Sequence, residues 1–113
     1  MNGGAPQQHC VVYCTCPDND SAARIAHALV DEQLAACVNL LPGVTSIYKW
    51  KGEIAHEKEV LLLIKTRRVL IPRLIGAIRP LHPYELPEVI SVPITDGLPD
   101  YLQWIDNELE SSV

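Results

Sequence analysis

Two cysteines stand one residue apart in the segment YCTCPD, where an apolar run ends at Pro17. Thiols at this spacing could bind a soft metal ion, form a redox pair or be the last buried residues of a strand. In a regular strand over His9–Cys16, Cys14 and Cys16 face the same side, about 6.6 to 7 Å apart. A relaxed disulfide needs Cα atoms about 4.4 to 6.8 Å apart, and two thiolates on one zinc ion lie about 3.8 Å apart. Because Pro17 also keeps Cys16 extended, the Cys-x-Cys spacing alone does not define a site.

Nucleophilic catalysis is a second chemistry that a cysteine and a histidine can supply. A Cys14–His82 dyad would need the thiol beside the imidazole and an oxyanion hole. The sequence offers neither a glycine-rich elbow nor a third residue to orient the imidazole. The acidic residues of CTCPDND would repel a phosphate group, and the predicted strand EVLLLIKT has no aromatic side chain for stacking RNA bases. We therefore expect a protein that is not an enzyme.

A mixed polar and aromatic set of residues stands apart from the cysteines. Its members are Trp50, Lys65, Tyr84 and Glu88. Trp50 lies at the tip of a predicted hairpin, and Tyr84 and Glu88 belong to a connection framed by prolines. If copies of the chain come together, these side chains could line a small-ligand pocket between subunits. The alternative is interface packing with a surface ion pair.

Length and composition limit the possible classes of protein. The 113 residues suffice for one domain, to which we assign residues 9–113, with residues 1–8 as a flexible tail. A membrane-spanning helix needs about 18 or more consecutive apolar residues, and no stretch of the sequence approaches this length. We therefore expect no membrane insertion. The net charge of −5 and the scattered basic residues argue against binding of nucleic acid. The start of the chain does not resemble a secretory signal, so we expect a cytoplasmic protein with free thiols.

Hydrophobic periodicity predicts four strands and three helices. The expected strands are His9–Cys16, Ala36–Trp50, Glu59–Thr66 and Glu88–Ile94. The first expected helix follows Pro17 and ends near Leu34, and the second runs from Leu70 to Ile78. The third begins near Pro99, with Leu102, Ile105 and Leu109 facing inward. Pro42–Gly43 would form a bulge or bend in the second strand. The order is that of an α+β, ferredoxin-like βαββαβ fold with an extra C-terminal helix.

The central hairpin is too long for its own domain. Ala36–Trp50 spans about 50 Å when extended, whereas a compact chain of this size is about 35 Å across. The tip, which carries Tyr48 and Trp50, then projects beyond the globule, where free strand edges would aggregate unless another subunit pairs with them. The continuous apolar centre of Glu59–Thr66 also suggests cover on both faces. We therefore predict a closed homo-oligomer through these strands, with a mobile exposed loop as the alternative.

Four motifs in the same order resemble the CutA family of divalent cation tolerance proteins. They are YCTCPD, LAACVNLLPGVTSIYKWKGEI, LHPYELPEVISVPI and DYLQWI. The resemblance covers about Val11 to Ile105 and implies a ferredoxin-like protomer in a homotrimer held together by the long hairpin strands. It also implies tolerance to copper and other divalent metals in bacteria, a link to membrane anchoring of acetylcholinesterase in animals, and a trimer architecture like that of the PII signalling proteins.

The same resemblance implies a pair of metal ligands. In copper-binding members a thiol at the position of Cys14 acts with a His-His pair before the segment PY, and here that pair is Leu81-His82. Cys14 and His82 are then the implied ligands, and copper is the implied ion, bound weakly because one histidine is missing. A thiolate and an imidazole suit copper but are too few for a closed structural site. The alternatives are a buried hydrophobic Cys14 and a His82 that satisfies carbonyl groups at a helix end.

Three functions are consistent with these features. The first is a cytoplasmic homotrimer that binds copper and is linked to metal tolerance. The second is a PII-like trimer whose cleft between subunits takes a small ligand and signals to a partner protein. The third is a structural trimer that serves as an anchor or platform.

Overall fold

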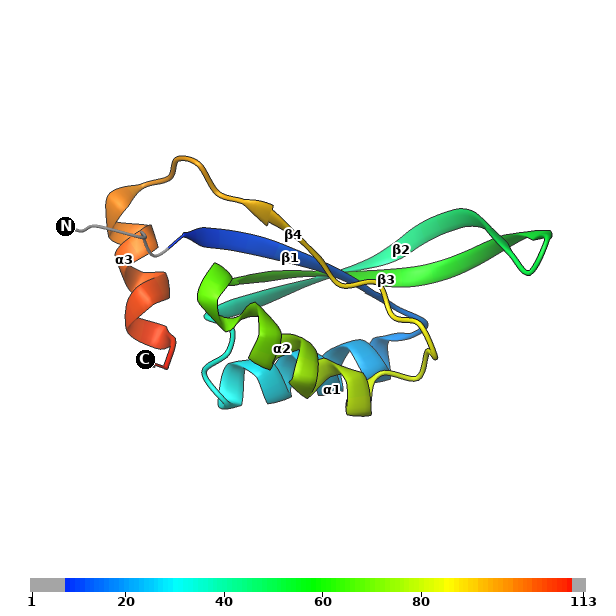
Figure 1. Cartoon of the computed structure of the whole chain (residues 1–113), viewed down its shortest axis with the longest axis horizontal. Helices are drawn as coiled ribbons and strands as arrows, with labels where there is room; N and C mark the ends of the chain where they lie inside the picture. Colours follow the sequence, from blue (N-terminus) through cyan, green and yellow to red (C-terminus); the bar gives the residue numbers. More distant parts are fainter. Residues whose placement is uncertain (1–7, 111–113) are drawn as a thin grey trace.

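The computed structural model of the chain describes residues 8–110. Its main elements are β1 (His9–Cys16), α1 (Asn19–Asp31), β2 (Cys37–Trp50), β3 (Glu53–Arg67), α2 (Ile71–Ile78), β4 (Ile90–Pro93) and α3 (Pro99–Glu108), with the 3₁₀ turns η1 (Arg68–Leu70) and η2 (Arg79–Leu81) on either side of α2. The strands form one antiparallel sheet in the order β2-β3-β1-β4 (Figure 1). The predicted ferredoxin-like βαββαβ fold with an extra C-terminal helix is confirmed.

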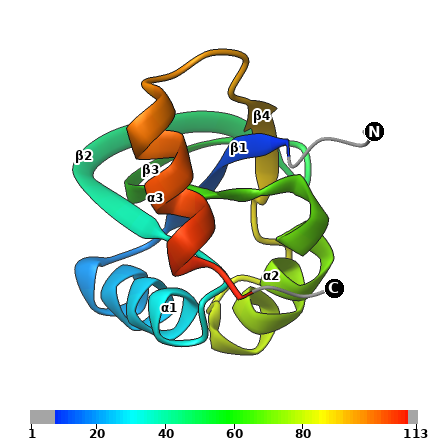
Figure 2. The same cartoon turned by 90° about the vertical axis from the view of Figure 1, so that its left-hand side faces the viewer.

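Helices α1 and α2 lie on the same face of the sheet (Figure 2). Asp18 caps α1, since its carboxylate accepts a hydrogen bond of 2.8 Å from the Ser21 N–H. The apolar stripe predicted for this helix faces the sheet, and its buried members are Ala22, Ile25, Ala26 and Leu29. This face therefore holds the main core.

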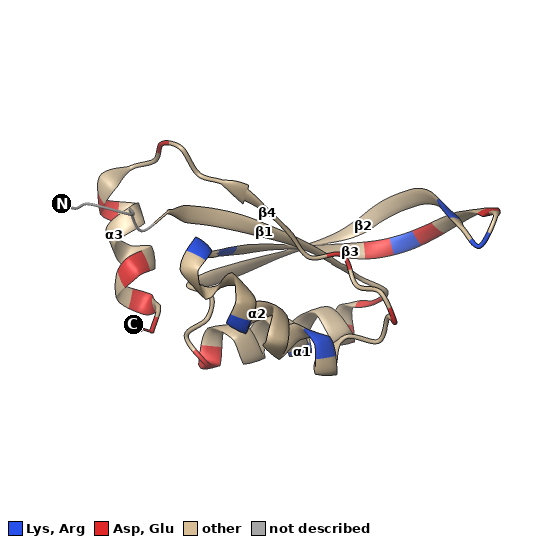
Figure 3. Ribbon diagram, in the orientation of Figure 1, with Lys and Arg blue, Asp and Glu red and all other residues tan. Residues whose placement is uncertain are grey.

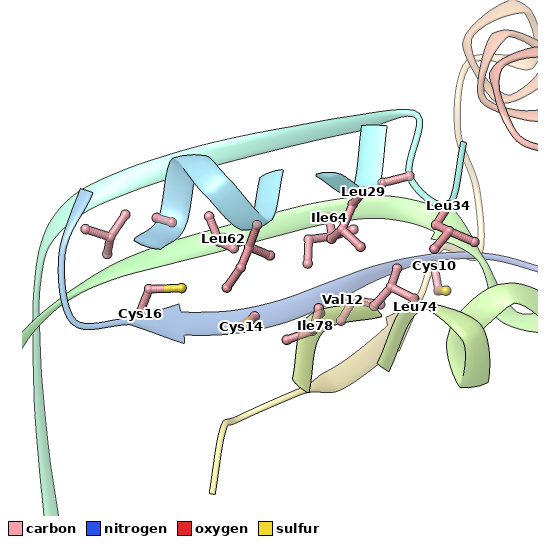
Figure 4. Packing of buried hydrophobic residues seen from close by; sticks show 14 residues of the cluster. Cys10, Val12, Cys14, Cys16, Leu29, Leu34, Leu62, Ile64, Leu74 and Ile78 are labelled. Carbon is pink, nitrogen blue, oxygen red and sulfur yellow. The ribbon is translucent and has the colours of Figure 1, made fainter. Parts of the chain in front are cut away.

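The core is built from alternate residues of the two central strands. From β1 come Cys10, Val12, Cys14 and Cys16, which follow one another along the strand (Figure 4). From β3 come Val60, Leu62 and Ile64, and α2 adds Leu74 and Ile78. Burying each large aliphatic side chain stabilises the fold by about 1.5 to 3 kcal/mol. Three of the four cysteines thus serve as core residues whatever else they do.

Strand β3 begins earlier than the sequence pattern predicted. It starts at Glu53 rather than at Glu59. Lys51 and Gly52 both adopt positive φ, at 52° and 83°, so the tight turn returns the chain directly into the ladder. The segment before Glu59 was not predicted as strand because its charged residues interrupt the alternation of apolar and polar residues that indicates a strand.

Two other elements are shorter than expected. Helix α1 ends at Asp31 rather than near Leu34. Strand β4 covers Ile90–Pro93 rather than Glu88–Ile94, since it pairs with β1 over four residues only. Both differences lie at element ends, where periodicity gives the weakest signal.

The β2–β3 hairpin continues well beyond the rest of the sheet. Strand β1 ends opposite Val60, so the residues of Val44–Glu59 pair only with each other, and we call this segment the hairpin arm. The register shifts between Leu41 and Val44, and Gly43 has a φ of 81°, which confirms the predicted bulge. The described chain measures 50 × 25 × 23 Å, so the hairpin projects as predicted (Figure 1).

The sheet face opposite α1 and α2 is largely apolar, and its side chains are half-buried or exposed. In the described part of the chain no helix packs over it (Figure 2). We call it the open face, and the register assigns to it Val11, Tyr13, Leu61, Leu63, Ile90 and Val92. The sequence suggested that β3 is covered on both faces, but within a single chain only the helical face is.

Helix α3 crosses the end of the sheet that lies away from the arm (Figures 1 and 2). The residues predicted to face inward do so, as Ile105 and Leu109 are buried and Leu102 packs against them. A polar contact adds to this packing, since His9 Nε2 lies 2.9 Å from a carboxylate oxygen of Asp106. The helix is therefore docked by both apolar and polar contacts.

The remaining predictions from composition concern the chain end and the surface. The tail predicted over residues 1–8 lies outside the described residues except for Gln8, whose carbonyl accepts a hydrogen bond of 2.8 Å from the Arg68 N–H. Within residues 8–110, no helix combines the length and the apolar character needed to span a bilayer. Lys and Arg are spread over the helices and the hairpin rather than gathered on one element (Figure 3).

Candidate metal-binding site

Three potential metal ligands meet where β1 ends and the loop after η2 passes by. The two sulfur atoms of Cys14 and Cys16 and a ring nitrogen of His82 all lie within 4.8 Å of one another. Cys16 Sγ is 3.8 Å from His82 Nε2. Both cysteines are 0% exposed and His82 is 7% exposed. Among residues 8–110 this is the one group of three such side chains with donor atoms so close together.

The family resemblance implied Cys14 and His82 as ligands and left Cys16 out, whereas the structure brings all three together. Backbone spacing fixes the distance between Cα atoms, but each sulfur can approach the other by rotation about its Cα–Cβ bond. The two sulfur atoms therefore lie closer together, within 4.8 Å, than the strand spacing of their Cα atoms alone would place them. The sequence did indicate that Cys14 and Cys16 lie on the same face of β1. It did not indicate that His82 lies beside them, and only the three residues together form a candidate metal site.

The backbone around His82 explains how the ring reaches β1. The His82 N–H donates to the Ile78 carbonyl at 3.0 Å, which closes the last turn of the helical segment. His82 itself is extended, with φ −86° and ψ 133°, as expected for a residue that precedes proline. The change from helical to extended backbone directs the imidazole to the end of β1, where it is buried beside Cys16.

Both ring nitrogens of His82 are held by main-chain groups. Nε2 donates to the Thr15 carbonyl at 2.8 Å, and Nδ1 accepts from the Tyr84 N–H at 3.1 Å. A carbonyl only accepts and an amide N–H only donates, so these contacts require the tautomer with the proton on Nε2. Without a metal, His82 is therefore a fully satisfied buried histidine, and an ion at Nε2 must displace the hydrogen bond to Thr15.

The two thiols differ in how easily they ionise. Their mutual hydrogen bond, together with burial, raises the pKa of the Cys14 thiol well above its ordinary value, and the carboxylates of Glu88 and Glu59 raise it further. The same hydrogen bond lowers the pKa of the Cys16 thiol, although burial, Asp18 and Glu59 oppose this. Within the pair, the mutual hydrogen bond therefore favours the thiolate form of Cys16, whereas burial and the nearby carboxylates oppose it.

A second polar contact lies beside the cluster at the base of the hairpin arm. The Tyr84 hydroxyl donates a hydrogen bond of 2.7 Å to the carboxylate of Glu59, which is only 6% exposed. Burial and this carboxylate raise the pKa of Tyr84 above its ordinary range. The Tyr84 ring also lies 5.0 Å from the His82 ring, centroid to centroid. One residue therefore links the imidazole to the arm.

The predicted small-ligand set is not gathered within one chain. Lys65 lies opposite Cys37 and donates to Asn39, whereas Trp50 lies opposite Glu53 at the tip of the arm. The 12 residue steps from Glu53 to Lys65 span about 40 Å of strand. Tyr84 contacts β3 between these two ends, and Glu88 is exposed in the loop before β4. Trp50 and Lys65 can therefore share a site only if they come from different copies of the chain.

The sequence model of one protein family matches residues 10–108, a stretch that includes both cysteines of the cluster, the hairpin arm and His82. The family is described as the CutA1 divalent ion tolerance protein. The chain is a member of the CutA1 family. The resemblance inferred from its motifs is thereby confirmed.

Several CutA proteins are similar to this CutA1 family member over most of its length. The divalent-cation tolerance protein CutA of Thermus thermophilus is 48% identical over 95 residues, or 84% of this chain and 92% of that protein. A solved structure of the Thermus protein covers 90% of this chain and 99% of its own, with a TM-score of 0.88 and 45% identity. Protein CutA of Mus musculus is 46% identical over 110 residues, or 97% of this chain. The chain spans 62% of the length of this mouse relative.

A solved structure from Archaeoglobus fulgidus extends the comparison to a more distant relative. It is described as the periplasmic divalent cation tolerance protein CutA. It covers 90% of this chain and 99% of its own, with 35% identity and a TM-score of 0.87. The fold is thus the same at lower identity, in a protein described for a different compartment from the one predicted here.

The donor set of the cluster suits a soft metal ion. Thiolates and imidazole are ligands of copper and zinc. With metal–sulfur bonds near 2.3 Å and metal–nitrogen bonds near 2.0 Å, donor atoms around one ion lie roughly 3.5 to 4.0 Å apart. The 3.8 Å between Cys16 Sγ and His82 Nε2 falls in this range. A bound ion would require loss of thiol protons and would tie β1 to the loop after η2.

Proposed function

We propose that this CutA1 family member is a homotrimer that binds copper through Cys14 and His82 and contributes in this way to tolerance of divalent metal ions. The buried cluster of thiol and imidazole groups carries the proposal, since its donor atoms are close enough to share one ion. Copper is favoured because sulfur and imidazole donors are soft. The names of the family and of the Thermus relative refer to tolerance of divalent ions.

The proposed role is binding rather than catalysis. A general base needs a free nitrogen lone pair near the proton that it removes. In His82, Nδ1 already accepts from the Tyr84 N–H and Nε2 carries the proton donated to Thr15. The nearby thiols are fully buried, which keeps them from an external substrate. These contacts support a site for a small ion and not for an acyl or phosphoryl substrate.

Two apolar surfaces support assembly into a trimer. On the hairpin arm, Ile47 and Ile54 are 66% and 68% exposed, and on the open face Ile90 is 55% exposed. Strand β2 also lies at an edge of the sheet, where its outer backbone groups are available to another chain. Contact between copies would bury both surfaces and cover that edge. A closed ring meets all these needs, and the family resemblance implies three copies.

A cytoplasmic location is part of the proposal. All four cysteines are free thiols, and such thiols persist in a reducing compartment. A thiolate site for copper also needs reducing conditions, because oxidation of its sulfur atoms would remove the ligands.

Binding of a small ligand between subunits is a second candidate function. It rests on the polar and aromatic character of Trp50, Lys65, Tyr84 and Glu88, and because Trp50 and Lys65 lie far apart within one chain it requires an assembly that brings them together. Such a site would resemble PII-like signalling in its dependence on the trimer, and it would not involve the cysteines. A bound mass that remains after copper is removed would favour this candidate over the first.

Native mass spectrometry and copper titration together test the first proposal. We expect the wild-type protein to have the mass of three chains and to bind one copper ion per chain. Cys14→Ser and His82→Ala should weaken binding at least about tenfold. Cys10→Ser is the matched control, since Cys10 is also buried on β1 but lies outside the cluster. Unchanged binding in both cluster variants would remove these residues from any copper site, and a stable monomer would refute the trimer.

A further inference from the structure

A third donor stands beside the two proposed ligands. We infer that Cys16 is a ligand as well, so that the site in this chain offers two thiolates and one imidazole to a soft ion, in the Cu(I) state when the ion is copper. This inference rests on the proposed copper binding at Cys14 and His82. It adds a residue that neither the family resemblance nor the names of the relatives assign.

Distance is the first argument for Cys16. Its sulfur is 3.8 Å from His82 Nε2, and it lies within 4.8 Å of the Cys14 sulfur. Three donors placed evenly around one ion, with bonds near 2.3 Å to sulfur and 2.0 Å to nitrogen, lie roughly 3.7 to 4.0 Å from one another. The observed cluster therefore needs shifts of about 1 Å or less, which side-chain rotation supplies. An ion held by Cys14 and His82 alone would still lie against the Cys16 sulfur.

Burial is the second argument. Cys14 and Cys16 are 0% exposed and His82 is 7% exposed, so solvent has little access to the space that they share. An ion there must take its ligands mainly from the protein. Zinc prefers four ligands and Cu(II) prefers a square-planar or tetragonal arrangement of nitrogen and oxygen, whereas soft thiolates select Cu(I). Three buried donors, two of them sulfur, thus fit Cu(I) best.

The contacts of His82 predict a signature of binding. To coordinate through Nε2, the ring must give up the hydrogen bond of 2.8 Å to the Thr15 carbonyl. The tautomer must then change as well, or the ring must rotate, because Nδ1 currently accepts from the Tyr84 N–H. Loading should therefore shift the ring resonances of His82 in an NMR spectrum, while those of His27, which lies outside the cluster, stay in place.

The test compares single thiol variants of the full chain loaded with Cu(I) under anaerobic conditions. Affinity is measured by competition with bicinchoninate, and X-ray absorption counts the sulfur atoms bound to copper. We expect two sulfur atoms in the wild type and one in Cys16→Ser, with affinity at least about tenfold weaker in the variant. Cys10→Ser is the matched control and should behave as the wild type. Cys16→Ala, checked by circular dichroism, separates loss of a ligand from loss of the fold.

The outcomes distinguish this inference from the proposed function. If copper has one sulfur ligand in the wild type, or if Cys16→Ser and Cys16→Ala bind it as tightly as the wild type, Cys16 is not a ligand. Loss of binding in Cys14→Ser would then leave the proposed function standing. If the folded wild-type chain binds no copper, both proposals fail. Equal weakening in Cys10→Ser would also overturn the assignment, because the effect would not be specific to the cluster.

Discussion

The body of the protein and its hairpin arm are built from the same two strands but are stabilised differently. In the body, β3 lies between β1 and β2, and Leu62 and Ile64 are completely buried under the helices. In the arm, Val44–Glu59, the strands pair only with each other, and Ile47 and Ile54 are largely exposed. A two-stranded hairpin is marginally stable alone in water. The body therefore has a core of its own, whereas the arm has none within one chain and is the part that the proposed contacts between copies would stabilise.

The candidate metal site lies at the junction of these two regions. Cys16 is the last residue of β1 and pairs with Val60, the residue that directly follows the end of the arm at Glu59. Tyr84 joins Glu59 to the same loop that carries His82. The donors are therefore buried and still lie next to the part of the chain that we propose contacts another copy. An ion bound here would stiffen the base of the arm.

The largest change in folding free energy is expected in the body. Ile64→Ala removes a fully buried side chain between the sheet and the helices and should lower the free energy of unfolding by about 2 to 5 kcal/mol. Urea unfolding at one fixed protein concentration measures the loss. Val69→Ala is the control, since Val69 is 62% exposed and outside the arm. Equal losses in the two variants would contradict the picture of a self-sufficient core.

A smaller change is expected at the junction. Tyr84→Phe removes the hydroxyl that donates to Glu59 and leaves a carboxylate that is 6% exposed without this partner. The loss should be about 1 to 2 kcal/mol near neutral pH, measured in the same unfolding experiment. Glu59→Gln keeps the size of the side chain and should cost less than Glu59→Ala. No difference between Tyr84→Phe and the wild type would show that the contact does not stabilise the base of the arm.

The junction also predicts a dependence on pH. Burial and Glu59 raise the pKa of Tyr84 in the folded state, so the folded chain holds the phenolic proton more tightly than the unfolded chain. The resulting stabilisation is complete below the ordinary tyrosine pKa of about 10 and falls as the pH rises above it. The advantage of the wild type over Tyr84→Phe should therefore shrink between about pH 10 and pH 11. An advantage that grows over this range would contradict the assignment.

The smallest change in subunit folding is expected in the arm, together with a change in assembly. Ile47→Lys combined with Ile54→Lys places two charges on surfaces that are already 66% and 68% exposed. Secondary structure measured by circular dichroism should stay the same, because the arm adds little to the core. Light scattering should show the mass fall from three chains to one. Val69→Lys, at a similarly exposed position outside the arm, should leave the mass unchanged, and a double variant that stays trimeric would remove the arm from the interface.

The features that the sequence predicted correctly are those with a local cause. The stripe from Ala22 to Leu29 follows from the helical repeat, and the bulge at Gly43 follows from a proline–glycine pair within a strand. The length of the hairpin is set by the number of residues between its bend and its turn. The early start of β3 was missed because the segment from Glu53 to Glu59 is mostly exposed and rich in charged residues, so it lacks the apolar pattern of a buried strand.

The sequence by itself determined the ferredoxin-like order of elements, the excess length of the hairpin and the single face shared by Cys10, Cys14 and Cys16. Strand and helix periodicity act between neighbours a few residues apart, so these features can be derived from the chain alone. Only the tertiary structure decided that His82 meets Cys16 across 66 residues and that Tyr84 meets Glu59 across 25. Such contacts depend on how the loop after η2 packs against the end of β1 and on side-chain rotation, and neither leaves a periodic trace in the sequence.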